Sequence, residues 1–363
     1  MAAALGLARR GLGRVWPNPA VGCVLVRDGR PVGRGWTQPG GRPHAETEAL
    51  RRAGPEAARG ATAYVTLEPC GHTGRTPPCA EALIAAGISR AVVAVADPDP
   101  RVAGRGLAAL EQAGIAVEVG CLAAEARSLN AGFFRRIEHA RPLVTVKLAT
   151  SLDGRIATGS GESRWITGPL ARARGHLMRA EHDAILVGAG TARADDPELT
   201  CRLPGLAAAS PVRVVVDSRL RLALTGRLAT GARRHPLWLI TAAADERGAR
   251  ERHKAFQACG AEVIEVGRAA SGWVDMRAAV AELGRRGITR LLVEGGARMV
   301  ASLIAADLVD RLAWFRAAIV IGGDGRPAAE AFGLDALAEA KAFRRVNLEP
   351  VGEDVLETYE RAA

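Results

Sequence analysis

Short apolar segments alternate with amphipathic segments over the first 120 residues of the chain. The first two apolar segments flank Asp28-Gly29, a dipeptide typical of hairpin turns. The segments that separate the later apolar segments have patterns typical of helices. Pro77-Pro78 precedes one of these expected helices, and at a helix start the missing N–H groups of proline are harmless. Strands that alternate with helices predict an α/β sandwich around a largely parallel sheet. We expect strands at residues 21–26, 31–36, 63–67, 91–96 and 115–119, and helices at 44–53, 79–84 and 107–112.

A second alternating pattern follows a helical stretch at residues 123–137. Arg141-Pro142 interrupts the chain there, and we place a domain boundary that divides it into residues 1–141 and 142–363. The second part again alternates expected strands and helices, so we expect a second α/β domain. Its strands are expected near residues 143–148, 184–187, 212–216, 237–240, 262–266, 291–293 and 313–321.

Length and charge favour two globular domains over a nucleic-acid-binding chain. The chain has 363 residues, and a domain usually has roughly 100–200. The net charge of +10 is evenly spread, because residues 1–140 and 141–363 each carry +5. Of the 49 basic residues 46 are Arg, a skew typical of a GC-rich genome, and aromatic residues for base stacking are only 4%. We therefore expect no nucleic-acid partner.

The sequence also gives no sign of a membrane or secreted protein. No stretch approaches the ~20 apolar residues of a membrane span. The first residues lack the charged region and the apolar core of a signal peptide. We expect a cytoplasmic protein without a membrane partner, in which the six cysteines are thiols or metal ligands rather than disulfides.

The strongest chemical signal is a set of zinc-binding residue types. His44 and Glu46 stand near the start of an expected helix, Cys70 follows a strand, and Cys79 begins another helix. Zinc in a catalytic site commonly has three protein ligands and one water, which His44, Cys70 and Cys79 would provide. A helix N-terminus favours the thiolate form of a cysteine. Glu46 would not be a ligand, and a carboxylate beside the metal can carry protons to a leaving amine.

This pattern resembles the His-x-Glu … Pro-Cys-x-x-Cys signature of the zinc-dependent cytidine-deaminase superfamily. Here eight residues rather than two separate the cysteines, a longer insertion that belongs to the riboflavin-pathway deaminases. The resemblance extends over essentially the whole chain to the bifunctional deaminase–reductases of riboflavin biosynthesis. It implies an N-terminal cytidine-deaminase-like α/β/α sandwich followed by a C-terminal dihydrofolate-reductase-like α/β domain. The supporting segments are residues 17–23, 41–46, 64–70, 97–98 and 102–106.

The same resemblance implies that Asn18, His72 and Arg75 hold the pyrimidine ring and its ribose phosphate. The arginine fork suits a phosphate, whereas Asn18 could also be only a turn residue between two prolines. A purely structural zinc site is a competing interpretation, in which His72 would be the fourth ligand. Residues 104–109 fit a dinucleotide-binding fingerprint, but a long loop after the strand favours a simple helix-opening turn.

Three clusters stand out in the second domain. Residues 147–155 form a strand that runs into an Asp-Gly turn, and Ser163-Arg164-Trp165 follows. Residues 187–191 and 195–200 form the second cluster. Residues 293–298 form a strand, a glycine pair and a helix start, a geometry that exposes backbone N–H groups to a phosphate. Each cluster alone could be an ordinary turn at the end of a strand.

Together the clusters resemble the reductase half of the same family, which uses NADPH. The resemblance places the cofactor against Ala149, Trp165, Thr191, Asp195, Ser218, Gly296, Ala297, Arg298, Met299, Val300, Ala301 and Ser302. It places the substrate against Ser163, Arg179, Leu199, Arg202 and Glu294. Lys147, Asp195 and Glu294 are candidates for assisting the proton transfer, and the sequence does not rank them.

We therefore expect a bifunctional enzyme of riboflavin biosynthesis that uses zinc and NADPH. Its first domain would deaminate 2,5-diamino-6-ribosylamino-4(3H)-pyrimidinone 5′-phosphate, and its second would reduce the ribosyl chain of the resulting aminouracil ribotide. We also expect a homo-oligomer. The alternative is a nucleic-acid-editing zinc deaminase with an accessory binding domain, which the cysteine spacing and the even charge disfavour. A reductase with a merely structural zinc module is a third hypothesis, and such a module would not need Glu46.

Overall fold

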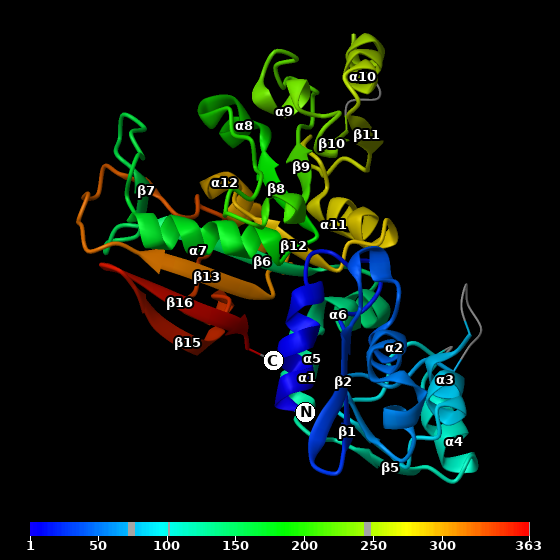
Figure 1. Cartoon of the computed structure of the whole chain (residues 1–363). Coiled ribbons are helices and arrows are strands. Elements are labelled where there is room, and N and C mark those ends of the chain that lie inside the picture. Colours follow the sequence, from blue (N-terminus) through cyan, green and yellow to red (C-terminus); the bar gives the residue numbers. More distant parts are fainter. Residues whose placement is uncertain (72–76, 101, 243–247, 363) are drawn as a thin grey trace. The chain divides into compact units, whose positions relative to one another are not determined.

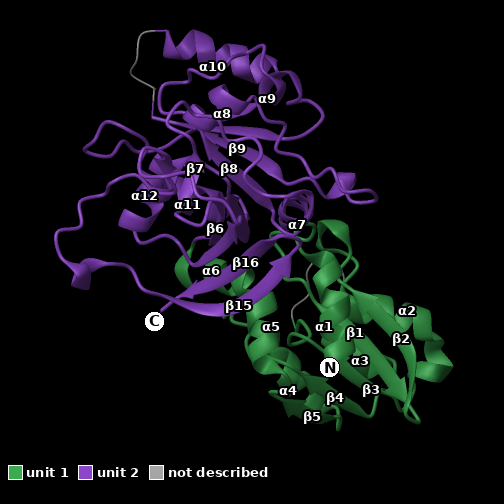
Figure 2. Ribbon diagram, turned by 90° about the vertical axis from the view of Figure 1, so that its left-hand side faces the viewer, with its two compact units in different colours: residues 1–140 green, residues 141–363 purple. Residues whose placement is uncertain are grey.

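The computed structural model describes residues 1–71, 77–100, 102–242 and 248–362. The chain forms two compact units, Met1–Ala140 and Arg141–Ala363, which are coloured separately in Figure 2. The domain boundary expected from the sequence lies one residue later. Each unit has its own sheet and its own hydrophobic core. In the described part of the chain, no helix is both long and apolar enough to cross a membrane.

The first unit is built on a five-stranded sheet with the strand order β2-β1-β3-β4-β5. Figure 1 labels β1, β2 and β5 of this sheet, and Figure 2 labels all five strands. Strand β1 is antiparallel to β2 and β3, whereas β3, β4 and β5 are parallel. The expected hairpin and parallel strands are therefore both present. The strands are β1 (Gly22–Arg27), β2 (Arg30–Trp36), β3 (Thr62–Val65), β4 (Arg90–Val93) and β5 (Ala116–Val119).

Six helices accompany this sheet in the described part of the first unit. The helical stretch expected at 123–137 is present as two helices, which are separated at Asn130. The Asn130 side chain donates to the backbone carbonyl of Ala20 and accepts from its N–H, both at 2.9 Å. The helices are α1 (Ala2–Ala8), α2 (Ala45–Ala58), α3 (Cys79–Ala85), α4 (Arg105–Gln112), α5 (Ala123–Leu129) and α6 (Ala131–His139).

Close packing of α2 on β2 fixes where the metal-binding residues stand. A Cβ atom at Gly35 would lie 2.1 Å from the carbonyl oxygen of Ala45, and one at Gly33 would lie 2.3 Å from that of Ala49. Only glycine allows the two backbones to approach so closely. The first turn of α2, which carries His44 and Glu46, is therefore held against the sheet.

The second unit contains a nine-stranded sheet with the order β11-β10-β9-β8-β12-β6-β13-β16-β15. The strands from β11 to β13 are parallel, and β16 and β15 continue the sheet antiparallel. The strands are β6 (Leu143–Thr150), β8 (Ala184–Gly188), β9 (Val212–Val216), β10 (Leu237–Thr241), β11 (Glu262–Glu265), β12 (Arg290–Val293), β13 (Arg311–Arg316), β15 (Phe343–Val351) and β16 (Asp354–Arg361).

Two expectations for this unit need correction. The strand expected at 313–321 is shorter and starts earlier, as β13, and the sequence pattern missed the β15–β16 hairpin entirely. Most residues of β15 are exposed on both faces of the sheet, so the strand has no apolar alternation to reveal it. The helices are α7 (Pro169–Ala180), α8 (Ala189–Asp195), α9 (Arg227–Thr230), α10 (Ala249–Ala258), α11 (Met276–Arg285) and α12 (Ala297–Ala305).

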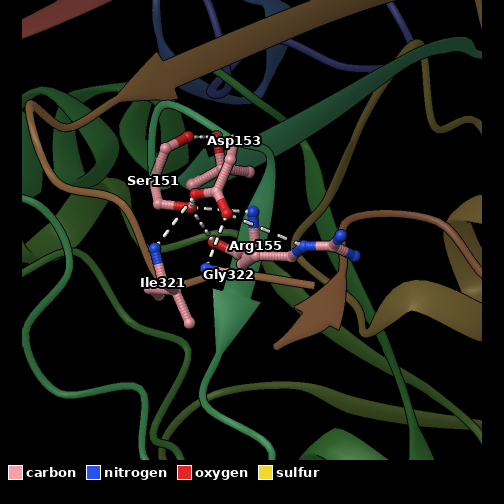
Figure 3. Close-up of polar contacts among 6 residues, drawn as sticks. Ser151, Asp153, Arg155, Ile321 and Gly322 are labelled. Carbon is pink, nitrogen blue, oxygen red and sulfur yellow. Dashed lines mark hydrogen bonds and ion pairs between the residues drawn. The ribbon is translucent and has the colours of Figure 1, made fainter. Parts of the chain in front are cut away.

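A small antiparallel sheet of β7 (Arg155–Ala157) and β14 (Arg326–Pro327) is anchored by one carboxylate (Figure 3). Asp153 accepts hydrogen bonds from the Ser151 hydroxyl at 2.6 Å and from the backbone N–H groups of Ile321 and Gly322 at 3.1 and 2.8 Å. These bonds hold the pKa of Asp153 down at about 2. The turn after β6 is thereby tied to the segment that leads into β14.

Candidate active sites

The predicted zinc ligands converge in the first unit. Nδ1 of His44 lies 3.2 Å from Sγ of Cys79 and 3.7 Å from Sγ of Cys70. Among the described residues this trio alone groups three or more His, Cys, Asp or Glu donors that could hold a metal, with all ligand atoms within 4.8 Å. Zinc bonds of about 2.0–2.3 Å to nitrogen and sulfur require donor separations of this size. The donor set therefore fits a zinc ion that has three protein ligands.

Hydrogen bonding and burial determine the protonation of this group. Hydrogen bonds from the Cys79 side chain, followed by those from His44, lower the pKa of Cys70 to about 4 despite its burial. The hydrogen bond with Cys70 raises the pKa of His44, and the hydrogen bond between Cys79 and Cys70, followed by burial, raises the pKa of Cys79. Burial raises the pKa of Glu46, which is only 3% exposed, to about 7. Glu46 interacts with Cys79 and is not a member of the donor trio.

A second buried carboxylate, Glu68, shapes the loop that carries Cys70. It accepts hydrogen bonds from the backbone N–H groups of Asp97, Gly104 and Gly106 at 3.2, 3.1 and 3.0 Å. Gly104 and Gly106 belong to the segment that fits a dinucleotide fingerprint, and α4 begins there at Arg105. The N–H groups that a pyrophosphate would need are therefore bound by Glu68, which agrees with a helix-opening turn. Sequence reasoning assigned no role to Glu68.

Of the residues expected to contact the deaminase substrate, only Asn18 can be placed. Its Nδ2 lies against Gly41, where an added Cβ would come within 1.9 Å and where φ is +86°. Gly41 therefore makes room for the Asn18 side chain three residues before His44. His72 and Arg75 lie outside the described residues.

The second unit holds a cavity of about 1960 Å³ at the carboxyl ends of its parallel strands. Nearly all residues predicted for the reductase line it. They are Ala149, Ser163, Trp165, Arg179, Thr191, Asp195, Leu199, Arg202, Ser218, Glu294, Gly296, Ala297, Arg298, Met299 and Ser302. Val300 and Ala301 do not line it, because they are 1% and 5% exposed on the buried side of α12. For these two residues the expected cofactor contact needs correction.

The start of α12 suits a phosphate-bearing cofactor. Gly296 precedes the helix, and its N–H donates to the Thr191 hydroxyl at 3.0 Å. A Cβ atom on Gly296 would lie 3.2 Å from that hydroxyl oxygen. The first N–H groups of a helix attract anions, and the residues at this helix start line the cavity. The residues present therefore fit NADPH.

A buried ion pair occupies one end of this cavity. Arg179 donates to both carboxylate oxygens of Glu294, at 2.7 and 3.0 Å, and to the backbone carbonyl of Thr200 at 3.0 Å. Burial alone would raise the pKa of Glu294, but the charge and hydrogen bonds of Arg179, with the charges of Lys147 and His176, together outweigh it and lower the pKa to about 2. Burial lowers the pKa of the nearby Lys147. The cavity thus holds an ionised carboxylate beside an ammonium group that is a stronger acid than usual.

Comparisons with known proteins agree with both sites. The model of the cytidine and deoxycytidylate deaminase zinc-binding region matches residues 1–95, and that of the RibD C-terminal domain matches residues 142–356. The riboflavin biosynthesis protein RibD of Escherichia coli is 43% identical over 366 residues, which cover 98% of this chain and 96% of that protein. This chain belongs to the RibD family. It is accordingly a bifunctional deaminase and reductase of riboflavin biosynthesis.

Solved RibD structures have the same fold over the full length. One form of the Acinetobacter baumannii RibD is 36% identical with a TM-score of 0.88, covering 100% of this chain and 98% of that one. A Thermotoga maritima structure, described as a diaminohydroxyphosphoribosylaminopyrimidine deaminase/5-amino-6-(5-phosphoribosylamino)uracil reductase, is 34% identical with a TM-score of 0.86. It covers 100% of this chain and 97% of that one. The expected fold class is confirmed, as are the zinc site at His44, Cys70 and Cys79 and the use of NADPH by a RibD reductase.

Proposed function

We propose that the unit up to Ala140 removes the 2-amino group of the diaminopyrimidinone ribotide and that the following unit reduces the ribosyl chain of the product. The convergence of His44, Cys70 and Cys79 beside the buried Glu46 carries the first assignment. The long cavity with its ion pair at one end supports the second. The description of the Thermotoga maritima relative supports the order of the two steps, because the reductase substrate that it names is an aminouracil.

In the deaminase unit, His44, Cys70 and Cys79 would hold zinc, which supplies Lewis-acid activation of water. Hydrolysis forms a carbon–oxygen bond at C2 of the pyrimidine and breaks the carbon–nitrogen bond, and the departing ammonia must gain a proton. Glu46 is buried beside the ligands without being one of them, so its carboxyl group is placed to carry that proton. Asn18 would contact the pyrimidine, and His72 and Arg75 would contact it and its ribose phosphate.

In the reductase unit, NADPH would supply a hydride to C1′ of the ribose. The bond between C1′ and the ring oxygen breaks, and that oxygen must gain a proton. Glu294 is ionised by its ion pair, whereas Lys147 combines a lowered pKa with a place in the cavity. Among the candidates named from the sequence we therefore assign the proton donation to Lys147. Asp195 is exposed and would contact the cofactor.

The remaining predicted residues would position the two ligands. Arg202 reaches into the cavity with a 56% exposed side chain and would bind the ribose phosphate, together with Arg179 from its ion pair. Ser163, Leu199 and Glu294 would contact the substrate. The cofactor would lie against Ala149, Trp165, Thr191, Ser218 and the exposed side of the α12 start, whose cavity-lining residues are Gly296, Ala297, Arg298, Met299 and Ser302.

We further propose that the enzyme acts in the cytoplasm on small pyrimidine ribotides and forms a homo-oligomer. The outer strand β15 supports the oligomer, because Val346 and Leu348 are 40% and 52% exposed on this sheet edge. Edge strands with exposed apolar side chains favour association.

A product analysis tests both activities. The zinc-containing enzyme is incubated with the diaminopyrimidinone ribotide, with and without NADPH, and the molecular masses of the products are measured by mass spectrometry. Without NADPH we expect the exchange of an NH group for oxygen, and with NADPH the further gain of two hydrogen atoms. An unchanged ribotide, or a reduction that precedes the deamination, would contradict the proposal.

A further inference from the structure

The segment that carries Arg202 along the reductase cavity is held in place by side chains. Residues 200–202 lie between α8 and β9 and belong to no helix or strand. Among the described residues, no hydrogen bond to another backbone group holds them. The side chains that bind this backbone are those of Arg179, Ser210 and His176. The position of Arg202 therefore depends on side chains from other parts of the chain.

The hydrogen bond of His176 ends on Arg202 itself. Nδ1 of the His176 ring accepts from the backbone N–H of Arg202 at 3.3 Å. The bond from Arg179 ends two residues earlier, on the backbone carbonyl of Thr200 at 3.0 Å. His176 and Arg179 lie on one face of α7 together with Arg172, and all three line the cavity. One face of one helix therefore both borders the cavity and holds the segment opposite it.

The His176 ring can accept this bond because it is neutral near neutral pH. Burial lowers the pKa of His176 below its ordinary value, and the charges of Arg179 and Arg202 lower it further. The charge of Glu294 and the backbone of Thr200 act in the opposite direction and do not outweigh them. A neutral imidazole has one nitrogen that accepts and one that donates, whereas a protonated ring has no acceptor.

The guanidinium of Arg202 makes a single ion pair within the described part of the chain. Its Nη1 lies 3.7 Å from a carboxylate oxygen of Glu198, and the two side chains are 56% and 47% exposed. An exposed ion pair of this kind does little to fix a side chain. The backbone bond to His176 therefore determines where the Arg202 side chain begins and which part of the cavity its guanidinium can reach.

We propose that His176 is a positioning residue of the reductase, which holds the backbone of Arg202 so that the Arg202 guanidinium meets the phosphate of the ribotide. This inference rests on the proposed function, in which Arg202 binds that phosphate. A guanidinium binds a phosphate best through two parallel hydrogen bonds, so a displaced side chain loses affinity. His176 acts through Arg202 and not by contact with the substrate.

The test replaces His176 in the full-length, zinc-containing enzyme. His176→Ala removes the acceptor, and His176→Phe keeps a ring of similar size without it. His176→Asn places an amide oxygen close to the position of Nδ1. His253→Ala is the matched control, because His253 also lies in a helix of this unit, α10, and does not line the cavity.

A double-mutant cycle with Arg202→Ala shows whether the two residues act together. It compares His176→Ala, Arg202→Ala and the variant that carries both substitutions with wild type. Steady-state kinetics give kcat, the KM for the aminouracil ribotide and the KM for NADPH of each variant.

We expect His176→Ala to raise the KM for the ribotide roughly three- to tenfold, the usual effect of losing one hydrogen bond between uncharged groups. Its kcat and its KM for NADPH should change little. His176→Phe should match His176→Ala, His176→Asn should restore most of the affinity, and His253→Ala should match wild type. Arg202→Ala should raise the KM for the ribotide further, and in that background His176→Ala should have no additional effect.

The outcomes separate failure of this inference from failure of the proposed function. If wild type does not oxidise NADPH in the presence of the aminouracil ribotide, the proposed function is wrong and the role of His176 falls with it. If wild type is active and His176→Ala leaves the KM for the ribotide unchanged, only the role of His176 is overturned. An equal rise in the KM for NADPH would also overturn it, because the effect would not be confined to the substrate.

Two further results would contradict the route through Arg202. The full effect of His176→Ala in the Arg202→Ala background would mean that His176 acts independently of Arg202. A His176→Asn variant no better than His176→Ala would mean that the hydrogen bond at Nδ1 is not the cause of the effect.

Discussion

His182 is a histidine that the fold keeps neutral. It is 3% exposed at the end of α7, and its Nδ1 donates to the carbonyl of Met178 at 2.6 Å. Its Nε2 has no hydrogen-bond partner among the described residues. Burial, with a further contribution from the charge of Arg290, lowers the pKa of His182 from 6.5 to about 3. A proton on this ring is therefore much less favourable in the folded chain than in the unfolded chain.

This shift predicts acid sensitivity of the reductase unit. Below pH 6.5 the unfolded chain takes up a proton at this position, whereas the folded chain does not until about pH 3. The contribution of neutral His182 is fully present above pH 6.5 and is lost as the pH falls from 6.5 towards 3. His182→Gln should reduce the slope of unfolding free energy against pH in this interval, as measured by urea denaturation. His139→Gln, at an exposed histidine, is the control, and an unchanged slope in His182→Gln would contradict the prediction.

Residue type and spacing predicted the residues of the metal site more completely than those of the cofactor site. His44, Glu46, Cys70 and Cys79 stand in local contexts that restrict their chemistry, so spacing and residue type were informative. Arg219 and Trp273 both line the reductase cavity and are in contact although they are 54 residues apart, and a hydrogen bond from the N–H of Val274 to Ser218 joins their segments. No periodicity encodes such a contact. The resemblance also assigned every residue from 296 to 302 to the cofactor, whereas helical geometry turns Val300 and Ala301 away from the cavity.

At the scale of elements, the apolar pattern predicted the buried central strands and missed the exposed hairpin at the edge of the second sheet. Every residue of β9 is buried, and the strand was found at its observed bounds. The exposed strand β15 left no such pattern, and β13 ends five residues before the apolar run does. Residues 317–321 leave the sheet and reach Asp153 instead, through the N–H of Ile321. A side-chain anchor from another part of the chain overrides the local propensity there.

This anchor predicts a connection between a surface turn and cofactor binding. The segment held by Asp153 continues through β14 to Arg326, Pro327 and Ala328, which line the reductase cavity. Asp153→Ala removes the acceptor of both N–H groups and should make residues 317–325 more sensitive to limited proteolysis. It should also raise the KM for NADPH more than it lowers kcat. Ammonia release serves as the internal control, and unaltered proteolysis and KM would refute a positioning role for Asp153.

At the scale of the whole molecule, two units with separate cores carry two different chemistries. Glu46 belongs to the zinc site of the first unit, and all residues that line the NADPH cavity belong to the second unit. The net charge of +10 is compatible with this division, because small anionic ligands need only a few arginines and the others can be solvated.

The division predicts that the activities can be separated by one substitution. Glu46→Gln keeps the size of the side chain but cannot carry a proton, so ammonia release should fall by at least about a hundredfold. NADPH oxidation with the aminouracil ribotide supplied directly should persist. Both rates are measured on the same preparation, together with bound zinc and circular dichroism. Loss of both activities in a folded, zinc-containing variant would contradict two independent sites.

In the deaminase unit, the carboxylate of Glu68 occupies a position at which backbone N–H groups in a turn could otherwise bind a phosphate. The four backbone N–H groups that donate to its carboxylate, those of Asp97, Gly104, Gly106 and Leu107, form an anion-binding site that this carboxylate occupies. The segment from Glu68 to Cys70 should therefore keep its position irrespective of salt or ligand. Emptying this site with Glu68→Ala should make deamination depend on an added small anion such as formate or sulfate. Assays over a series of anion concentrations would reveal this chemical rescue, and wild type should not respond to them.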